Sequence, residues 1–268
     1  MVASLTSMSL ALSLMPRVSG GFDFANLYAV TGGTPFNAGS VASALEKAET
    51  DEARQLDQAR KKPEVQRDLA RYEKVVREAG SLDDILDDPV ARKVFLKANG
   101  LGELSAYAGL AKKALASDPG DADSLANRLA GVNGAWLEAV NKYKFYLRGV
   151  GVLKTSEAIK EVKDDYVAEV RLDTLDDQIP GLGSAVLFKK IAASLDTPVK
   201  ILGSALGREV VTTALGLVRQ VAVQSLEAQE KAITQRLDPK KLKDPEFVDR
   251  LVQRYLIQLN GGTSGVTA

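Results

Sequence analysis

Residues 81–101 of the chain read SLDDILDDPVARKVFLKANGL, and residues 197–217 read TPVKILGSALGREVVTTALGL. The offset between the two stretches is constant, at 201 − 85 = 116. Seven of the 21 aligned positions carry the same residue: Ile85/Ile201, Leu86/Leu202, Arg92/Arg208, Val94/Val210, Ala98/Ala214, Gly100/Gly216 and Leu101/Leu217. Repeated units build a common core because each buries the apolar face of its neighbour. The repeat therefore predicts one helical unit used twice.

Helix starts and stops are marked in and around both copies. A capping residue followed by Pro predicts a helix start, because the side chain accepts hydrogen bonds from free amides and Pro fits the first turn. Such pairs begin at Asp88, Asp118, Thr197, Asp238 and Asp244. Gly100 and Gly216, each followed by Leu, predict helix ends, because Gly readily adopts the left-handed conformation found there.

Apolar residues recur at spacings of three and four without the alternation of strands, which predicts an all-α fold. We expect a multi-helix globular domain with an internal duplication, made of two related helical units plus bridging helices. Within a duplicated domain over residues 40–259, unit one covers about 63–131, the bridge 132–177 and unit two about 180–259. The pattern of residues 40–62 predicts one long polar helix with a thin apolar stripe. The segments 1–39 and 260–268 are rich in Ser, Thr and Gly, and we expect both to be flexible.

Composition excludes several functions. The 268 residues contain 35 Lys and Arg and 35 Asp and Glu, so the basic excess typical of nucleic-acid binding is missing. With no Cys and no His, the chain cannot form disulfides, the usual zinc sites or His-based triads. We predict no catalytic residue, no cofactor and no metal. An enzyme would have to use carboxylates, Lys, Tyr or a bound cofactor.

The first fifteen residues, MVASLTSMSLALSLM, resemble a secretory signal only in part. No positive charge precedes the apolar run, the first Arg is Arg17, and no convincing cleavage site follows. No stretch approaches the roughly 20 apolar residues that span a bilayer. We therefore expect no cleaved signal peptide and no integral membrane segment.

The same segment contains a candidate interaction surface. Leu5, Met8, Leu12 and Met15 occur at i, i+3, i+7 and i+10, so a helix here would be apolar on one face and lined by Ser and Thr on the other. Such a helix could dock on a partner. That the segment folds back onto its own domain or stays loose is an equally weighted alternative.

Three other features favour structural roles. The cluster Asp83, Asp84, Asp87 and Asp88 precedes a predicted helix start, where carboxylates stabilise the helix dipole, so we expect caps rather than a cation site. Arg92 and Arg208 occupy equivalent positions, and we expect each to form a salt bridge. The aromatic residues near Trp136 lie on one helical face, which favours a place in the core.

Several of these motifs together resemble a known family. They are FLKANGL (95–101), ASDP (116–119), SLANRL (124–129), PGL (180–182), ILG (201–203), REVVTTALGL (208–217), AQEKAI (228–233) and RLD (236–238). The chain resembles domain of unknown function 1217, a bacterial family typical of alphaproteobacteria, over most of residues 40–258. The resemblance implies an all-helical fold, no defined catalytic residue and genes often found among flagellar genes.

From this resemblance we expect a non-enzymatic, flagellum-associated structural or assembly protein that acts through helical protein-protein interaction. Its partners would be proteins, with flagellar components as the candidates, and its location the flagellum or the cytoplasm. One alternative is a cytoplasmic helical adaptor or export chaperone. Another is an enzyme based on carboxylates or Lys, which requires a deep polar pocket around a strongly perturbed acid. The N-terminal segment and the bridge are the places where we expect function to reside.

Overall fold

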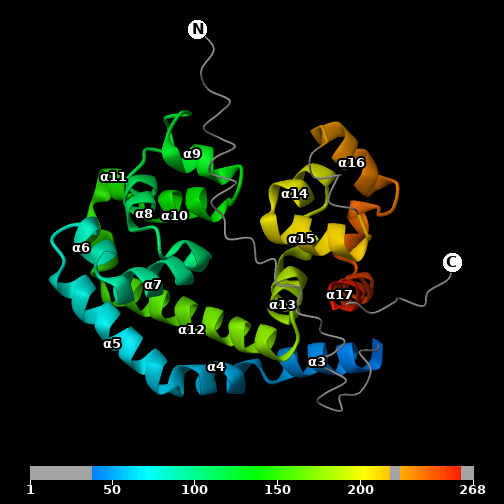
Figure 1. Cartoon of the computed structure of the whole chain (residues 1–268), viewed down its shortest axis with the longest axis horizontal. Coiled ribbons are helices and arrows are strands. Elements are labelled where there is room, and N and C mark those ends of the chain that lie inside the picture. The colour runs from blue at the N-terminus through cyan, green and yellow to red at the C-terminus, as the bar shows by residue number, and fades with distance from the viewer. Residues whose placement is uncertain (1–37, 218–223, 261–268) are drawn as a thin grey trace, which may run out of the picture. The chain divides into compact units, whose positions relative to one another are not determined.

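The computed structural model describes residues 38–217 and 224–260, and the regular elements within these ranges are helices (Figure 1). The prediction of an all-α fold is confirmed. The first half consists of α3 (Ala38–Thr50), α4 (Glu52–Lys61), α5 (Pro63–Glu78), α6 (Leu82–Asp87), α7 (Pro89–Ala98), η1 (Gly102–Leu104), α8 (Ala108–Leu115), α9 (Leu125–Ala130), α10 (Ala135–Tyr143), α11 (Phe145–Arg148) and η2 (Val150–Leu153). The second half consists of α12 (Ser156–Gln178), α13 (Leu182–Ile191), η3 (Ala192–Ser194), α14 (Pro198–Gly203), α15 (Ala205–Ala214), α16 (Leu226–Thr234), η5 (Pro239–Lys243) and α17 (Pro245–Leu259).

The duplication is visible in the helix boundaries. Adding 116 to the bounds of α6 and α7 gives the bounds of α14 and α15. Both copies end in the same way. Gly100 has φ +69° and Gly216 has φ +61°, and the amides of Leu101 and Leu217 donate to carbonyls five residues back, at Leu96 and Thr212. These are Schellman caps, in which a left-handed residue lets the chain turn back over the last helical turn.

The capping residues explain most of the helix starts. Ser81 and Asp84 form a reciprocal capping box at α6, and Asp88 accepts hydrogen bonds from two amides of α7. Thr197 and Asp244 cap α14 and α17, while Asp238 caps the 3-10 helix η5.

The predicted helix start at Asp118 is wrong. The Asp118 carboxylate accepts from the amide of Gly120, two residues on, and the chain turns instead of winding into a helix. Gly120 favours such a turn because it stabilises a helix poorly. The next helix, α9, begins only after Ser124, which caps it.

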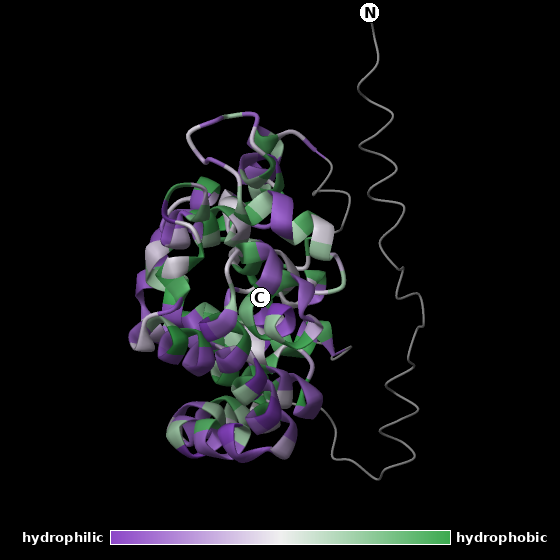
Figure 2. Ribbon diagram, turned by 90° about the vertical axis from the view of Figure 1, so that its left-hand side faces the viewer, coloured by the Kyte–Doolittle hydropathy of each residue, from purple (hydrophilic) through white to green (hydrophobic). Residues whose placement is uncertain are grey.

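Two hydrophobic cores form within residues 38–217 and 224–260. The first core contains buried side chains from α4 to α12, ending at Val167, and the second contains those of α12 from Leu172 onward together with α13 to α17. The second core also contains Val41, Leu45 and Ala48 of α3, the first described helix. Single helices contain both hydrophilic and hydrophobic residues, as expected of amphipathic helices that cover a core (Figure 2).

The expectation of one long helix over residues 40–62 is wrong. The helix breaks at Asp51, so that α3 contacts α13 and α17 while α4 contacts α12 and α5. A thin apolar stripe is all that either half needs, because each half packs on a different core.

The predicted bridge, residues 132–177, does more than connect. Its first helix, α10, buries Trp136 and Val140 in the first core, and the 23-residue α12 runs through both cores. In packing, α12 covers α5 and α7 as α17 covers α13 and α15. The counterpart of α17 is therefore α12.

The predicted segments 1–39 and 260–268 lie outside the described residues, except for Ala38, Gly39 and Asn260. The same holds for Leu5, Met8, Leu12 and Met15.

The matched helix ends give a first prediction. Replacing Gly100 or Gly216 by Ala forces a Cβ into a left-handed conformation, so each change should lower the free energy of unfolding by about 1 kcal/mol. Among the described residues, a Cβ at Gly216 meets no atom within 4 Å and a Cβ at Gly100 meets only Ala135, at 3.6 Å, so the loss would be conformational and not steric. Urea unfolding measures it.

Gly109 supplies the control, because it lies in the first turn of α8 and a Cβ added there would meet no atom of the described residues within 4 Å. Its replacement by Ala should stabilise the protein by up to about 1 kcal/mol, since Ala favours a helix more than Gly does. Equal effects of all three changes would contradict the assignment of Gly100 and Gly216 as left-handed caps.

Candidate functional site: the Arg171 joint and the acidic face of α12

The two cores meet at a buried arginine. Arg171 of α12 is 3% exposed and lies between Val167, which packs in the first core, and Leu175, which packs in the second. A buried guanidinium is costly unless its N–H groups find acceptors. The acceptors come from the break between α3 and α4.

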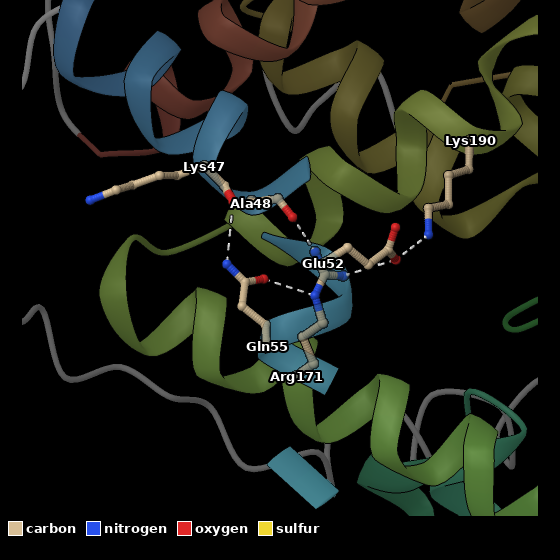
Figure 3. A network of polar contacts seen from close by, with 6 residues as sticks. All are labelled: Lys47, Ala48, Glu52, Gln55, Arg171 and Lys190. Carbon is tan, nitrogen blue, oxygen red and sulfur yellow. Dashed lines mark hydrogen bonds and ion pairs between the residues drawn. The ribbon is translucent and has the colours of Figure 1, made fainter. Parts of the chain in front are cut away.

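We use the term Arg171 joint for Arg171, Ala48, Glu52, Gln55 and Lys190 (Figure 3). The guanidinium donates to the Ala48 carbonyl, to Gln55 Oε1 at 2.9 Å and to Glu52 Oε1 at 3.4 Å. In an unbroken helix the Ala48 carbonyl would accept from the amide four residues on, that of Glu52. Arg171 takes the place of that amide and so stabilises the break.

Lys190 of α13 completes the joint by donating to Glu52 Oε1 at 2.7 Å. This hydrogen bond, with the nearby charges of Lys190 and Arg171, holds the pKa of the Glu52 carboxyl below its ordinary value. Burial lowers the pKa of Arg171, an effect that the Glu52 carboxylate opposes. The joint thereby ties α4, α12 and α13 to the end of α3.

A second feature is the row of carboxylates on α12. Asp165, Glu169, Asp173 and Asp176 follow one another at helical spacing, which places them on one face. Burial raises the pKa of Asp165 and of Asp176, and it raises the pKa of Glu169 to about 6. We call this row the acidic face of α12.

Two lysines supply countercharge to the acidic face. Lys97 of α7 donates to Asp173, and Lys142 of α10 lies 3.7 Å from Asp165. Asp176 accepts from the amide of Gly183 at 2.7 Å. Most of the row is thus used to hold neighbouring elements against α12. Within the described ranges, no group of three or more carboxylates is arranged to hold a metal ion.

A groove of about 500 Å³ lies between the start of α10 and α14. One wall is the start of α10, with Asn133 and Glu138, and the other is formed by α14 and its flanks, with Lys200 and Ser204. Small residues line much of the rest, and Glu169 is not among the lining residues. The groove therefore does not place the perturbed acid where a substrate could reach it.

The remaining sequence-based candidates have structural roles. Asp84 accepts hydrogen bonds from the amides of Gly80 and Ser81, which lower the pKa of its carboxyl. Asp83 and Asp87 form ion pairs with Lys112. The interpretation of this cluster as helix caps is confirmed for Asp84 and Asp88.

The predicted salt bridges of Arg92 and Arg208 are wrong, because both guanidiniums bind backbone carbonyls. Arg92 donates to Leu86 O at 2.5 Å and to Ser105 O at 2.7 Å, and Arg208 donates to Leu202 O at 3.1 Å. Each Arg thus satisfies a carbonyl near the end of the short helix that precedes its own, at equivalent places in the two copies.

The predicted core position of the aromatic residues is confirmed. Trp136, Tyr143 and Phe145 are buried, whereas Tyr146 is 41% exposed. Tyr143 and Phe145 stack with ring centroids 5.3 Å apart, beside Phe95. Lys144, with φ +51°, separates α10 from α11 between these two rings.

Sequence reasoning missed Arg171, although a signal was present. Val167, Arg171 and Leu175 recur at four-residue intervals, so the arginine interrupts an apolar stripe. A charge at such a position indicates a buried group with a specific partner. The partner could not be found from the sequence, because it lies on α3 and α4.

The Arg171 joint gives a second prediction. Arg171→Met removes the donors and leaves the Ala48 carbonyl without its partner, so the free energy of unfolding should fall by about 2–4 kcal/mol. Arg54→Ala is the matched control, since Arg54 is 66% exposed and pairs with Asp51 three residues away. It should change stability by less than about 0.5 kcal/mol. Urea unfolding of both variants measures these changes. Similar losses of stability in the two variants would contradict the role given to the Arg171 joint.

Glu169 gives a third prediction. Its folded-state pKa of about 6 lies above the ordinary value of 4.5, so the folded protein binds the proton more tightly than the unfolded chain. Ionised Glu169 therefore lowers stability as the pH rises from 4.5 through 6. Glu169→Gln should stabilise the protein by about 1–2 kcal/mol at pH 7.5 and have little effect at pH 4.5, where Glu169 of the folded protein is protonated and therefore neutral like Gln.

Thermal and urea unfolding at both pH values test this difference. Glu161→Gln is the control, because Glu161 lies on the same helix but is 54% exposed and pairs with Lys142. It should change stability by less than about 0.5 kcal/mol at either pH. A gain at Glu169 that does not depend on pH would point to packing instead of charge.

The described residues include no helix that is both long and apolar enough to cross a membrane. Comparison with known proteins adds a fold relative. The chain is similar to the crystal structure of protein AGR_C_984 from Agrobacterium tumefaciens, with a TM-score of 0.66 and 23% sequence identity, over 82% of this chain and 92% of that one. At this identity the likeness concerns the fold. Among curated proteins none matches the sequence.

The family comparison covers more than half of the sequence. The pattern of the family described as "Protein of unknown function (DUF1217)" matches residues 98–248. The matched part includes α8 to α16, the acidic face of α12 and Arg171. The chain belongs to the DUF1217 family.

Proposed function

We propose that the protein is a non-enzymatic, flagellum-associated structural or assembly protein that acts through helical protein-protein interaction. The observation that carries the proposal is the use made of charged side chains, among which Arg171 is buried. Arg171, Glu52 and Lys190 fix one helix against another, and the acidic face of α12 is largely paired to neighbouring elements. Such an arrangement suits a scaffold that presents surfaces to partners. The flagellar context rests on the family resemblance.

The N-terminal segment is the proposed docking element. Its apolar residues Leu5, Met8, Leu12 and Met15 have the spacing of a helix face that fits a groove on a partner. A partner bound in this way would contact the segment, while the helical domain that follows serves as its support.

Deletion of residues 2–15 gives a fourth prediction. Partner association should be lost in a pull-down with the full-length chain as reference, while helicity and melting temperature stay unchanged. Two further variants test whether the apolar face of the segment makes the contact, or whether any segment of this length is enough. Leu5→Glu with Leu12→Glu should abolish capture of the partner, whereas Thr6→Glu with Ser13→Glu, on the polar face, should preserve it. Normal partner capture by the deletion variant would contradict the docking proposal.

The principal alternative is a cytoplasmic adaptor or export chaperone. Fractionation of cells into cytosol, basal bodies and culture supernatant separates the two, because an adaptor stays in the cytosol and a structural component appears with the flagellum.

An enzyme based on carboxylates remains the lesser alternative. Glu169, with its pKa raised to about 6, is the acid that favours it. Its absence from the lining of the 500 Å³ groove argues the other way.

A further inference from the structure

Helix α3 comes from the first half of the sequence but packs in the second core. It contacts α13 and α17 in the second core, whereas its neighbour α4 contacts α12 and α5 (Figure 1). The chain that separates α3 from α13 includes every element of the first core. Helix α3 thus packs in a core whose other elements lie far from it in the sequence.

Few apolar contacts hold α3 in place. Among its described side chains, those fully buried are Val41, Leu45 and Ala48, one along each successive turn. Elements with little buried apolar surface open at lower free energy than the rest of a fold. Helix α3 is therefore among the elements that can leave without unfolding the remainder.

The surface beneath α3 selects its occupant by charge. Lys189 of α13 lies 2.5 Å from Glu49 of α3 and 2.6 Å from Asp249 of α17. The Lys189 side chain is 20% exposed, so the interaction is only partly screened by water. The part of α13 and α17 that α3 covers, for which we use the term groove, thus takes an apolar helix face with a carboxylate next to its last buried residue.

The link to α4 allows α3 to be exchanged. The helix break at Asp51 lies directly after α3, and the Arg171 joint fixes the angle there through the Ala48 carbonyl. If this contact opens, α3 can swing about Asp51 while α4 stays on α12. A short element next to a hinge is the usual unit of domain swapping.

We propose that the groove between α13 and α17 is a docking site for α3 of a second copy of this chain, so that two chains assemble by exchanging α3. In the exchanged dimer each groove regains Val41, Leu45 and Ala48 and the Glu49–Lys189 ion pair, now between chains. The inference is independent of the flagellar proposal, because its only partner is the chain itself.

Charge-swapped full-length chains test the exchange. In Glu49→Lys, the introduced lysine faces Lys189 of its own chain. In Lys189→Glu, the introduced glutamate faces both Glu49 and Asp249. Each chain alone thus has a like-charge contact, whereas a mixed dimer with exchanged helices has an opposite-charge contact in both grooves. We expect a dimer fraction at least tenfold higher in the mixture than in either variant alone, by size-exclusion chromatography with light scattering and by native mass spectrometry.

The double variant Glu49→Lys with Lys189→Glu is the control, because it restores the ion pair within one chain. It should fold and elute as the unaltered protein does, and it should not form dimers with either single variant more readily than they do alone. A mixture that stays monomeric, with both single variants folded by circular dichroism, would overturn the proposal.

A second measurement serves if a single variant does not fold. A fluorescent peptide of residues 38–54, which contains α3, is added to the unaltered full-length chain. Saturable binding that weakens at least tenfold when the peptide carries Glu49→Lys supports exchange, and the absence of binding up to millimolar peptide rejects it.

Discussion

Arg171 is the interaction on which the arrangement of this fold depends. A guanidinium inside a protein must have its donors satisfied, and here the acceptors are a backbone carbonyl of α3 and two side chains of α4. This requirement fixes three things together: the break in the N-terminal helix, the crossing of α12 over it, and the junction of two hydrophobic cores that meet along α12. Apolar packing alone would permit α12 to shift or rotate, whereas a forked donor with three named acceptors specifies one register.

The duplication shows which features a helical unit must keep and which it can exchange. Both copies keep the left-handed glycine and the Arg bound to a carbonyl of the short helix. The caps differ, with Asp88 in one copy and Ser204 in the other, because either side chain accepts from a free amide. Gly207 stands where the first copy has Ala91, since a Cβ at Gly207 would come within 2.8 Å of Leu195. The two copies differ at positions whose surroundings differ. They carry the same residue at positions where the backbone conformation or a backbone carbonyl requires it.

Local features of the fold could be predicted from the sequence, and long-range ones could not. Caps and glycine stops act within a few residues, so Asp88, Gly100 and Asp244 could be interpreted correctly. The helix start predicted at Asp118 was wrong because the same Asp-Pro signal serves a turn when Gly follows. The split of residues 40–62 and the partners of Arg171 depend on contacts between segments more than a hundred residues apart, and no local pattern encodes which core a thin apolar stripe will join. The raised pKa of Glu169 likewise depends on burial set by neighbouring helices.

The position of α3 in the second core affects how the chain must fold during synthesis. Helix α3 ends at Thr50, and the last helix that it contacts, α17, begins at Pro245. Helix α3 therefore leaves the ribosome long before α13 and α17, on which it packs, have been synthesised. The first core can form while Val41 and Leu45 still lack a partner. Closure of the fold is a late event of high contact order, which is expected to be slow. Throughout that interval the apolar stripe of α3 has no partner within its own chain, and a chaperone or another nascent copy can reach it.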